Sequence, residues 1–179
     1  IGYRGYKVRP YLDRGWGVLL TTWRGYSGNP GKPGEAGLHA DGRAALAFLD
    51  RAGVAPRQLV LYGESLGGGV AVALAAELRD NGSPPGALVL EAPFSSLADV
   101  AAGHYPIFPV RLLIRDRFDS LKTLGRNRAP VLVIHGENDR IIPVAHGRRM
   151  LEAAGAEAVG RFIAGAGHND PYEFDAHET

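Results

Sequence analysis

The stretch that decides the fold is Gly63-Glu64-Ser65-Leu66-Gly67-Gly68-Gly69. It follows an apolar run at residues 58–62, and Val70, Leu74 and Leu78 continue behind it at the spacing of a helix. A G-x-S-x-G sequence between a strand and a helix is typical of a sharp turn that holds a nucleophilic serine in a strained conformation. A glycine-rich turn whose serine only caps the helix is the alternative, but the flanking elements favour a nucleophile at Ser65. We expect glycine at 63 and 67 because a Cβ at either position would collide with the neighbouring strand or helix.

Four more apolar runs have the length of strands, at residues 17–22, 87–91, 131–135 and 159–163. They are rich in Val, Leu and Ile without clean alternation, which is typical of strands covered on both faces. Segments with helical spacing separate them. Strands that alternate with helices predict an α/β fold with right-handed βαβ units and a mostly parallel, doubly wound sheet. Ligands of such sheets bind beyond the carboxyl ends of the strands.

Two further groups follow the last two predicted strands and fit the chemistry of a serine nucleophile. A serine hydroxyl needs a base that takes its proton and a third group that orients the base. His168 lies in a loop of small residues after the last strand, and Asp139 follows the strand before it. We therefore predict His168 as the base and Asp139 as its acidic partner. Ser65 also lies at a helix N-terminus, so the N–H of Leu66 is predicted to stabilise an oxyanion.

Other acidic residues compete with Asp139 for this role. Glu137 lies two residues earlier. Glu91 ends the third predicted strand, a position at which some enzymes with a serine nucleophile carry the acidic partner of the base. Asp170 follows His168 too closely to reach back to its Nδ1 atom. The metal-site alternative, with Glu137 and Asp139 as oxygen ligands, is disfavoured beside so complete a set of three groups.

The remaining histidines receive other interpretations. His135 ends a strand and is predicted to be a hydrogen-bonded structural residue. His104 lies between the third and fourth strands, in a segment from which it could contact a substrate. The last three are predicted to be solvated: His39, His146 and His177.

Five motifs in order carry a resemblance to a known family. They are Arg24-Gly25-Tyr26-Ser27-Gly28, the glycine-rich turn at 63–69, Pro93-Phe94-Ser95-Ser96, the run at 135–143 and the run at 165–170. Together they resemble the α/β-hydrolases grouped with serine aminopeptidase-like enzymes, a branch that also includes depalmitoylating thioesterases of eukaryotes. The resemblance covers nearly the whole chain. It implies an α/β-hydrolase fold, a triad of Ser65, Asp139 and His168, and an oxyanion donor at Leu66.

The chain departs from the family pattern at two places. Thr22-Trp23 stands where many members have Asp-Tyr. Members also carry a His-Gly motif after an earlier strand, whose loop donates the second oxyanion N–H, and nothing of the kind precedes Leu12. Residues 1–16 are predicted to form the helix after that strand, which would lie between the strands at 17–22 and 58–62. We therefore expect residues 1–179 to be a single, incomplete domain of a longer protein, which also stops before the usual final helix.

Composition excludes several functions and leaves the substrate open. The net charge of +1 and the absence of a run of like charge give no reason to expect nucleic acid as a partner. The chain has no cysteine and no apolar run long enough to span a membrane. The proposed chemistry needs no metal and no organic cofactor.

The predicted substrate is a small or acyl molecule, with an ester or thioester as the first candidate. A peptide with a free N-terminus is the second, and a binding protein without turnover is the third. A cap-like insertion is predicted around residues 93–128, whose apolar side chains would either line an acyl pocket or pack a short helix onto the core. Those side chains are Tyr105, Ile107, Phe108, Val110, Leu112, Leu113 and Ile114.

Overall fold

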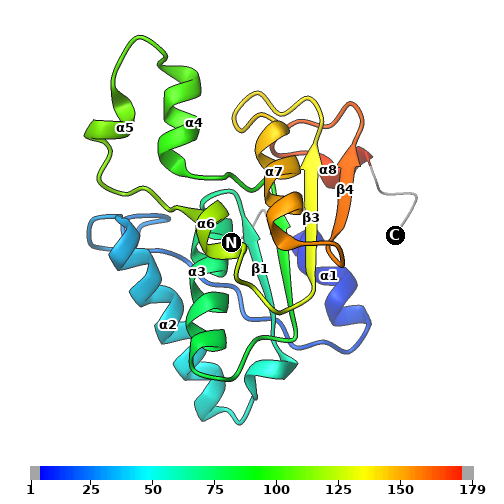
Figure 1. Cartoon of the computed structure of the whole chain (residues 1–179). Helices are drawn as coiled ribbons and strands as arrows, with labels where there is room; N and C mark the ends of the chain where they lie inside the picture. The colour runs from blue at the N-terminus through cyan, green and yellow to red at the C-terminus, as the bar shows by residue number, and fades with distance from the viewer. Residues whose placement is uncertain (1–4, 175–179) are drawn as a thin grey trace.

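The computed structural model describes residues 5–174 and contains one four-stranded sheet (Figure 1). Its strands are β1 (Val60–Glu64), β2 (Ala87–Glu91), β3 (Val131–Gly136) and β4 (Val159–Ile163), in the spatial order β1-β2-β3-β4. All three strand pairs are parallel. The carboxyl ends of the strands therefore meet at one edge of the sheet, and the predicted α/β class is confirmed.

Helices cover the two faces of this sheet. One face carries α3 (Leu66–Asp80), α6 (Ser120–Leu124) and α7 (Ala145–Ala154), with α2 (Glu35–Arg51) packed on the outer side of α3. The other face carries α1 (Gly5–Asp13) and the short α8 (Pro171–Phe174). In Figure 1, α4 (Leu97–His104) and α5 (Val110–Leu113) extend away from the sheet. None of the helices in the described residues has the length and hydrophobicity that a membrane crossing requires.

The core lies between the sheet and the helices α3, α6 and α7. Leu88 and Leu90 of β2 are fully buried there, packed with Ala75 of α3 and Met150 of α7. Because successive side chains of a strand point to opposite faces, Glu91 points the other way, toward α1. This alternation separates an apolar layer from a polar cluster on the reverse side of the same strands.

The strand predicted at residues 17–22 is absent from the structure. These residues have no regular secondary structure, and Val18, Leu19 and Leu20 are 39%, 42% and 40% exposed. An extended segment becomes a strand only when a neighbour accepts and donates its backbone hydrogen bonds, and β1 pairs only with β2 within residues 5–174. The apolar character of the run was therefore insufficient to predict its pairing.

The strand predicted at 58–62 starts two residues later than expected. Pro56–Gln58 form a short 3₁₀ helix, in which the Gln58 side chain accepts a hydrogen bond from the Ala55 N–H at 2.9 Å. Proline favours the start of such a turn because it has no N–H to lose and its φ is already suitable. The predicted helix within residues 1–16 is present as α1.

The segment around residues 93–128 contains α4, α5 and α6. Its start is held by a helix cap, since the Ser96 hydroxyl accepts the Asp99 N–H at 3.0 Å. Val110 and Ile114 are half-buried, but packing onto the core, one of the two expectations for the apolar residues of this segment, is wrong for the other five. These are 60–91% exposed: Tyr105, Ile107, Phe108, Leu112 and Leu113.

We predict that Leu90→Ala lowers the free energy of unfolding by about 2–5 kcal/mol, because it leaves a cavity in the closed core. Leu112→Ala is the matched control: it removes the same atoms from a side chain that is 86% exposed, and should change stability by less than about 0.5 kcal/mol. Urea denaturation of both variants checks this. Equal losses in the two variants would contradict the assignment of the core.

Candidate active site

Ser65 lies in a strained turn between β1 and α3. Its φ is 51° and its ψ is −118°, a combination that L-residues rarely adopt and that costs on the order of 1–3 kcal/mol. The Ser65 N–H donates to the Glu91 carbonyl at 2.9 Å, and its own carbonyl accepts the Gly68 N–H at 2.9 Å. A Cβ on Gly63 would lie 2.5 Å from the Gly67 carbonyl oxygen. The absence of that Cβ lets the strand and the helix approach closely enough to form the turn.

The structure brings Ser65, His168 and Asp139 into one hydrogen-bonded chain. The Nε2 atom of His168 lies 3.1 Å from the Ser65 hydroxyl oxygen. Its Nδ1 atom lies 2.7 Å from the Asp139 Oδ2 atom. In the sequence His168 is 29 positions from Asp139 and 103 positions from Ser65. Each of the three nevertheless follows the carboxyl end of a strand in the same parallel sheet. Parallel pairing is what brings them together.

Backbone contacts between two loops fix the distance from Asp139 to His168. The Asn138 N–H donates to the Ala166 carbonyl at 2.8 Å, and the Glu137 N–H donates to the Ile163 carbonyl at 3.0 Å. A Cβ on Gly136 would collide with the carbonyls of Ala166 and Gly167. Close packing of the ends of β3 and β4 therefore sets the geometry of this pair.

Asp139 is buried and accepts hydrogen bonds from several donors. Its Oδ1 atom accepts the backbone N–H groups of Ile141 and Ile142, each at 2.8 Å. His135 approaches its Oδ2 atom at 3.3 Å through Nε2. Burial alone would raise the pKa of Asp139, but the hydrogen bonds from His135, His168 and the Ile142 backbone outweigh it and hold that pKa well below its ordinary value. Asp139 is thus an anion at neutral pH, suited to orient the imidazole of His168.

The competing acidic residues lie elsewhere. Glu137 binds Arg148 at the surface, at 2.8 Å. Glu91 is fully buried on the reverse face of the sheet and binds Lys7. Asp170 accepts the Gly167 N–H at 2.6 Å, within the loop that carries His168. Asp139 is the acidic residue that the structure places against His168.

Two histidine predictions need correction. His146, expected in solvent, is buried, and its Nδ1 atom lies 2.9 Å from the Ser95 hydroxyl oxygen and 3.1 Å from Arg149. Burial, and next the charge of Arg149, lower the pKa of His146 to about 4, so its ring is neutral at pH 7. His39, expected in an exposed position, is half-buried edge-on against Phe118. Both result from long-range contacts that helical spacing does not reveal.

Two more histidines, His135 and His104, lie near backbone carbonyl oxygens of the loop that follows Asp139. His135 is fully buried and its Nε2 atom lies 2.8 Å from the Ile142 carbonyl oxygen, in keeping with a structural residue. His104 is exposed, with Nε2 2.8 Å from the Ile141 carbonyl oxygen in the loop that follows Asp139. His177 lies outside the described residues.

A second polar cluster adjoins the turn and was not predicted from the sequence. We call it the Lys7 cluster: Lys7, Tyr62, Glu64, Glu91 and Tyr172. Its members come from α1, β1, β2 and α8, so no local pattern could have revealed it. The two glutamates, each at the carboxyl end of a strand, were the only available signal.

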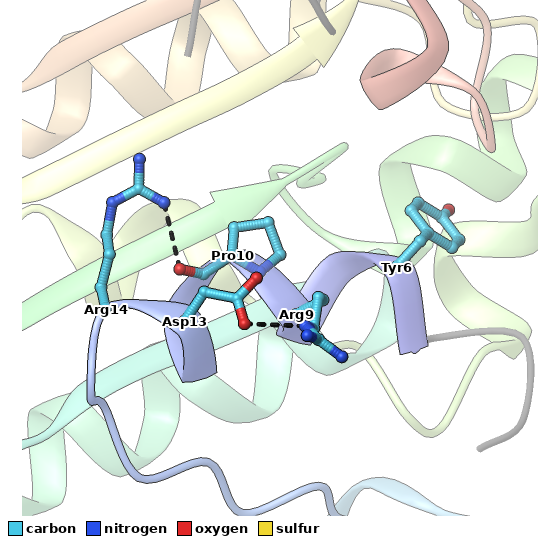
Figure 2. A pocket seen from close by; sticks show the side chains of 5 residues that line it. All are labelled: Tyr6, Arg9, Pro10, Asp13 and Arg14. Atoms are coloured by element: carbon cyan, nitrogen blue, oxygen red, sulfur yellow. Dashed lines mark hydrogen bonds and ion pairs between the residues drawn. The ribbon is translucent and has the colours of Figure 1, made fainter.

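The outer side of α1 carries a separate hollow of about 520 Å³ (Figure 2). It is lined by Tyr6, Arg9, Pro10, Asp13 and Arg14, and none of these takes part in the hydrogen bonds that join Ser65, His168 and Asp139. Figure 2 shows Arg9 bonded to Asp13 of the same helix, at 2.7 Å. Such an exposed pair contributes little to stability. Within residues 5–174, no three His, Asp or Glu side chains gather as a metal site would need.

The chain is similar to several curated proteins and to solved structures. An uncharacterised protein of Mycobacterium tuberculosis H37Rv is 46% identical over 162 residues, covering 90% of this chain and 56% of that protein. The α/β hydrolase domain-containing protein 17B of Homo sapiens is 34% identical, covering 86% of this chain and 50% of its own. The lysophosphatidylserine lipase ABHD12 of Danio rerio is 32% identical, covering 83% and 42%. No family model matches the chain.

The solved monoacylglycerol lipase of Paleococcus ferrophilus has the same fold. The two superimpose with a TM-score of 0.69 at 20% identity, over 98% of this chain and 86% of the lipase. The chain belongs to the α/β-hydrolase superfamily. This α/β-hydrolase chain spans about half the length of the curated relatives it matches.

We predict different outcomes for the two glycines of the turn. Gly63→Ala should destabilise the protein by about 1–3 kcal/mol, because its Cβ would press on the Gly67 carbonyl and overpack the turn. A Cβ on Gly67 meets nothing within 4 Å, contrary to the expectation that both glycines are sterically required. Gly67→Ala is therefore the control and should be nearly neutral in thermal denaturation. A larger loss in Gly67→Ala than in Gly63→Ala would contradict this geometry.

The lowered pKa of Asp139 predicts a pH-dependent contribution to stability. A carboxylate with a depressed pKa in the folded state stabilises the fold above its unfolded-state pKa of about 3.9, and loses that contribution as the pH falls through the folded-state value. The stability difference between wild type and Asp139→Asn should be largest near pH 7 and shrink steadily below about pH 4. Urea denaturation from pH 7 to pH 2 measures it. A difference that grows on acidification would contradict the hydrogen-bonded, ionised Asp139.

Proposed function

We propose that this α/β-hydrolase chain carries the catalytic residues of a serine hydrolase that cleaves a carboxylic ester or thioester through an acyl-enzyme. One observation supports the proposal above all others: the unbroken relay from the Ser65 hydroxyl through His168 to Asp139, with contacts of 3.1 and 2.7 Å. Such a relay is what a weak hydroxyl nucleophile requires.

The first step acylates the enzyme. His168 accepts the proton of the Ser65 hydroxyl as its oxygen attacks the substrate carbonyl, and the carbonyl oxygen becomes an oxyanion. Leu66 is the first residue of α3, where N–H groups have no partner inside the helix, so its N–H is the proposed donor to that oxyanion. The tetrahedral intermediate then expels an alcohol or thiol, which leaves with the proton from His168.

The second step returns the enzyme to its starting state. His168 takes a proton from water, the hydroxide attacks the acyl carbon, and Ser65 leaves with that proton while a carboxylic acid is released. Asp139 stays ionised throughout. It holds the imidazole in the tautomer with the proton on Nδ1 and stabilises the imidazolium that forms in each step.

Esters of apolar acyl chains are the substrate class to test first. Ile107 and Leu112 in the segment between α4 and the end of α5 offer exposed apolar surface, 91% and 86% exposed. One curated relative is named a lysophosphatidylserine lipase, which is consistent with a lipid ester. A peptide with a free N-terminus is less well supported, because its ammonium needs a carboxylate, and Glu64 and Glu91 are already bound to Lys7.

A fluorophosphonate probe and an ester series test the function. In the full chain, Ser65→Ala should abolish labelling and lower kcat/KM for p-nitrophenyl esters by roughly 10⁴–10⁶-fold, because the nucleophile is lost. Ser83→Ala, in the exposed turn after α3, is the matched control and should label like wild type.

The substrate series separates the remaining alternatives. Turnover of p-nitrophenyl esters that rises with acyl length, with no turnover of amino-acid p-nitroanilides, is the expected result. Preferential turnover of the anilides would favour an aminopeptidase instead. A wild-type protein that neither labels nor turns over esters would sink the proposal and favour a binding protein.

A further inference from the structure

The Lys7 cluster holds two buried charges, Lys7 and Glu91, and a half-buried one, Glu64, beside the nucleophile. The Lys7 ammonium donates to the Glu64 Oε2 atom at 2.8 Å and to both carboxylate oxygens of Glu91, at 2.7 and 2.8 Å. Lys7 is 6% exposed and Glu91 is fully buried. Isolated charges are expensive to remove from water, so this group of charges requires mutual contact.

Two tyrosines complete the surroundings of these charges. The Tyr62 hydroxyl donates a hydrogen bond to the Glu91 Oε2 atom and lies 3.1 Å from the Tyr172 hydroxyl. Burial, and next the charge of Glu91, raise the pKa of Tyr62, so it remains a donor at neutral pH. The Lys7 ammonium also lies 5.1 Å from the centre of the Tyr172 ring, within the range of a cation–π contact.

Both glutamates are connected directly to Ser65. Glu64 precedes it in the chain, and the Glu91 carbonyl accepts the Ser65 N–H at 2.9 Å. Glu64 and Glu91 are also register partners at the ends of β1 and β2. Two carboxylates side by side in a poorly solvated place repel each other. Without a cation between the two carboxylates, that repulsion would push apart the ends of β1 and β2. These two strand ends hold the strained turn at Ser65 in place.

We propose that Lys7 is a positioning residue, whose ammonium bridges Glu64 and Glu91 and thereby keeps the Ser65 hydroxyl aligned with His168. Lys7 touches neither the hydroxyl nor the imidazole, and acts through the two strand ends. Strained backbone at a functional site persists only when its surroundings over-determine it. The bridge from α1 is one such constraint, made from the face of the sheet opposite α3. This inference rests on the serine hydrolase function proposed above.

The test measures kcat, KM and Tm in the full chain with a p-nitrophenyl ester, below the Tm of every variant. Lys7→Met should lower kcat by about 10²-fold, the loss typical of a misplaced catalytic group, and leave KM unchanged. Arg9→Met is the matched control: it removes a cation from the same helix, where Arg9 binds Asp13 at the surface (Figure 2), and should match wild type.

A second variant separates electrostatic positioning from a general effect on the fold. Lys7→Met combined with Glu91→Gln removes the bridge and the repulsion together, so kcat should return to within about tenfold of wild type. This double variant carries the test alone if Lys7→Met does not fold.

Three results would overturn the inference. They are a wild-type kcat in folded Lys7→Met, a change confined to KM, and a double variant that stays inactive or unfolded. A wild type without any esterase activity would instead refute the proposed function, so the two failures are distinguishable.

Discussion

The strained backbone of Ser65 is the feature on which the site depends. Its φ of 51° is reached because β1 turns into α3 over a glycine, where a Cβ would touch the carbonyl of Gly67. This turn fixes the hydroxyl at the carboxyl edge of the sheet and places Leu66 at the first position of the helix. The loops after β3 and β4 bring Asp139 and His168 to the same edge, because all the strands of this sheet are parallel. The proposed chemistry therefore depends on the close approach of the backbone at Gly63 and Gly67, and on the parallel direction of the strands.

Two polar networks lie around this turn. His135 and the backbone of Ile141 and Ile142 keep Asp139 ionised, on the side of β3 and β4. On the reverse face, Lys7 joins Glu64 and Glu91, at the ends of β1 and β2. The apolar layer of Leu88 and Leu90 faces the opposite direction, toward α3 and α7. Side chains of β2 thus alternate between two faces of the sheet. Those on one face pack in the core, and Glu91 on the other face binds Lys7 beside the nucleophile.

Local signals in the sequence were sufficient to predict much of the fold. They were also sufficient to predict that the three site residues lie close together. Short apolar runs located β2, β3 and β4, and the glycines around Ser65 indicated the turn. The order of Ser65, Asp139 and His168, each after a strand, was enough to expect them at one edge. Contacts between distant segments were beyond such signals. The run at 17–22 reads as a strand by composition, but strand formation depends on a partner that composition does not specify. The burial of His146 and of Lys7 depends on Ser95 and Glu91, residues far along the chain.

A crystal structure of the protein after reaction with a fluorophosphonate tests the central claim most directly. We expect the phosphorus bonded to the Ser65 oxygen, its phosphonyl oxygen within hydrogen-bond distance of the Leu66 N–H, and the His168 imidazole still joined to Asp139. A phosphorus bonded to another residue would contradict the account, as would an imidazole turned away from Ser65.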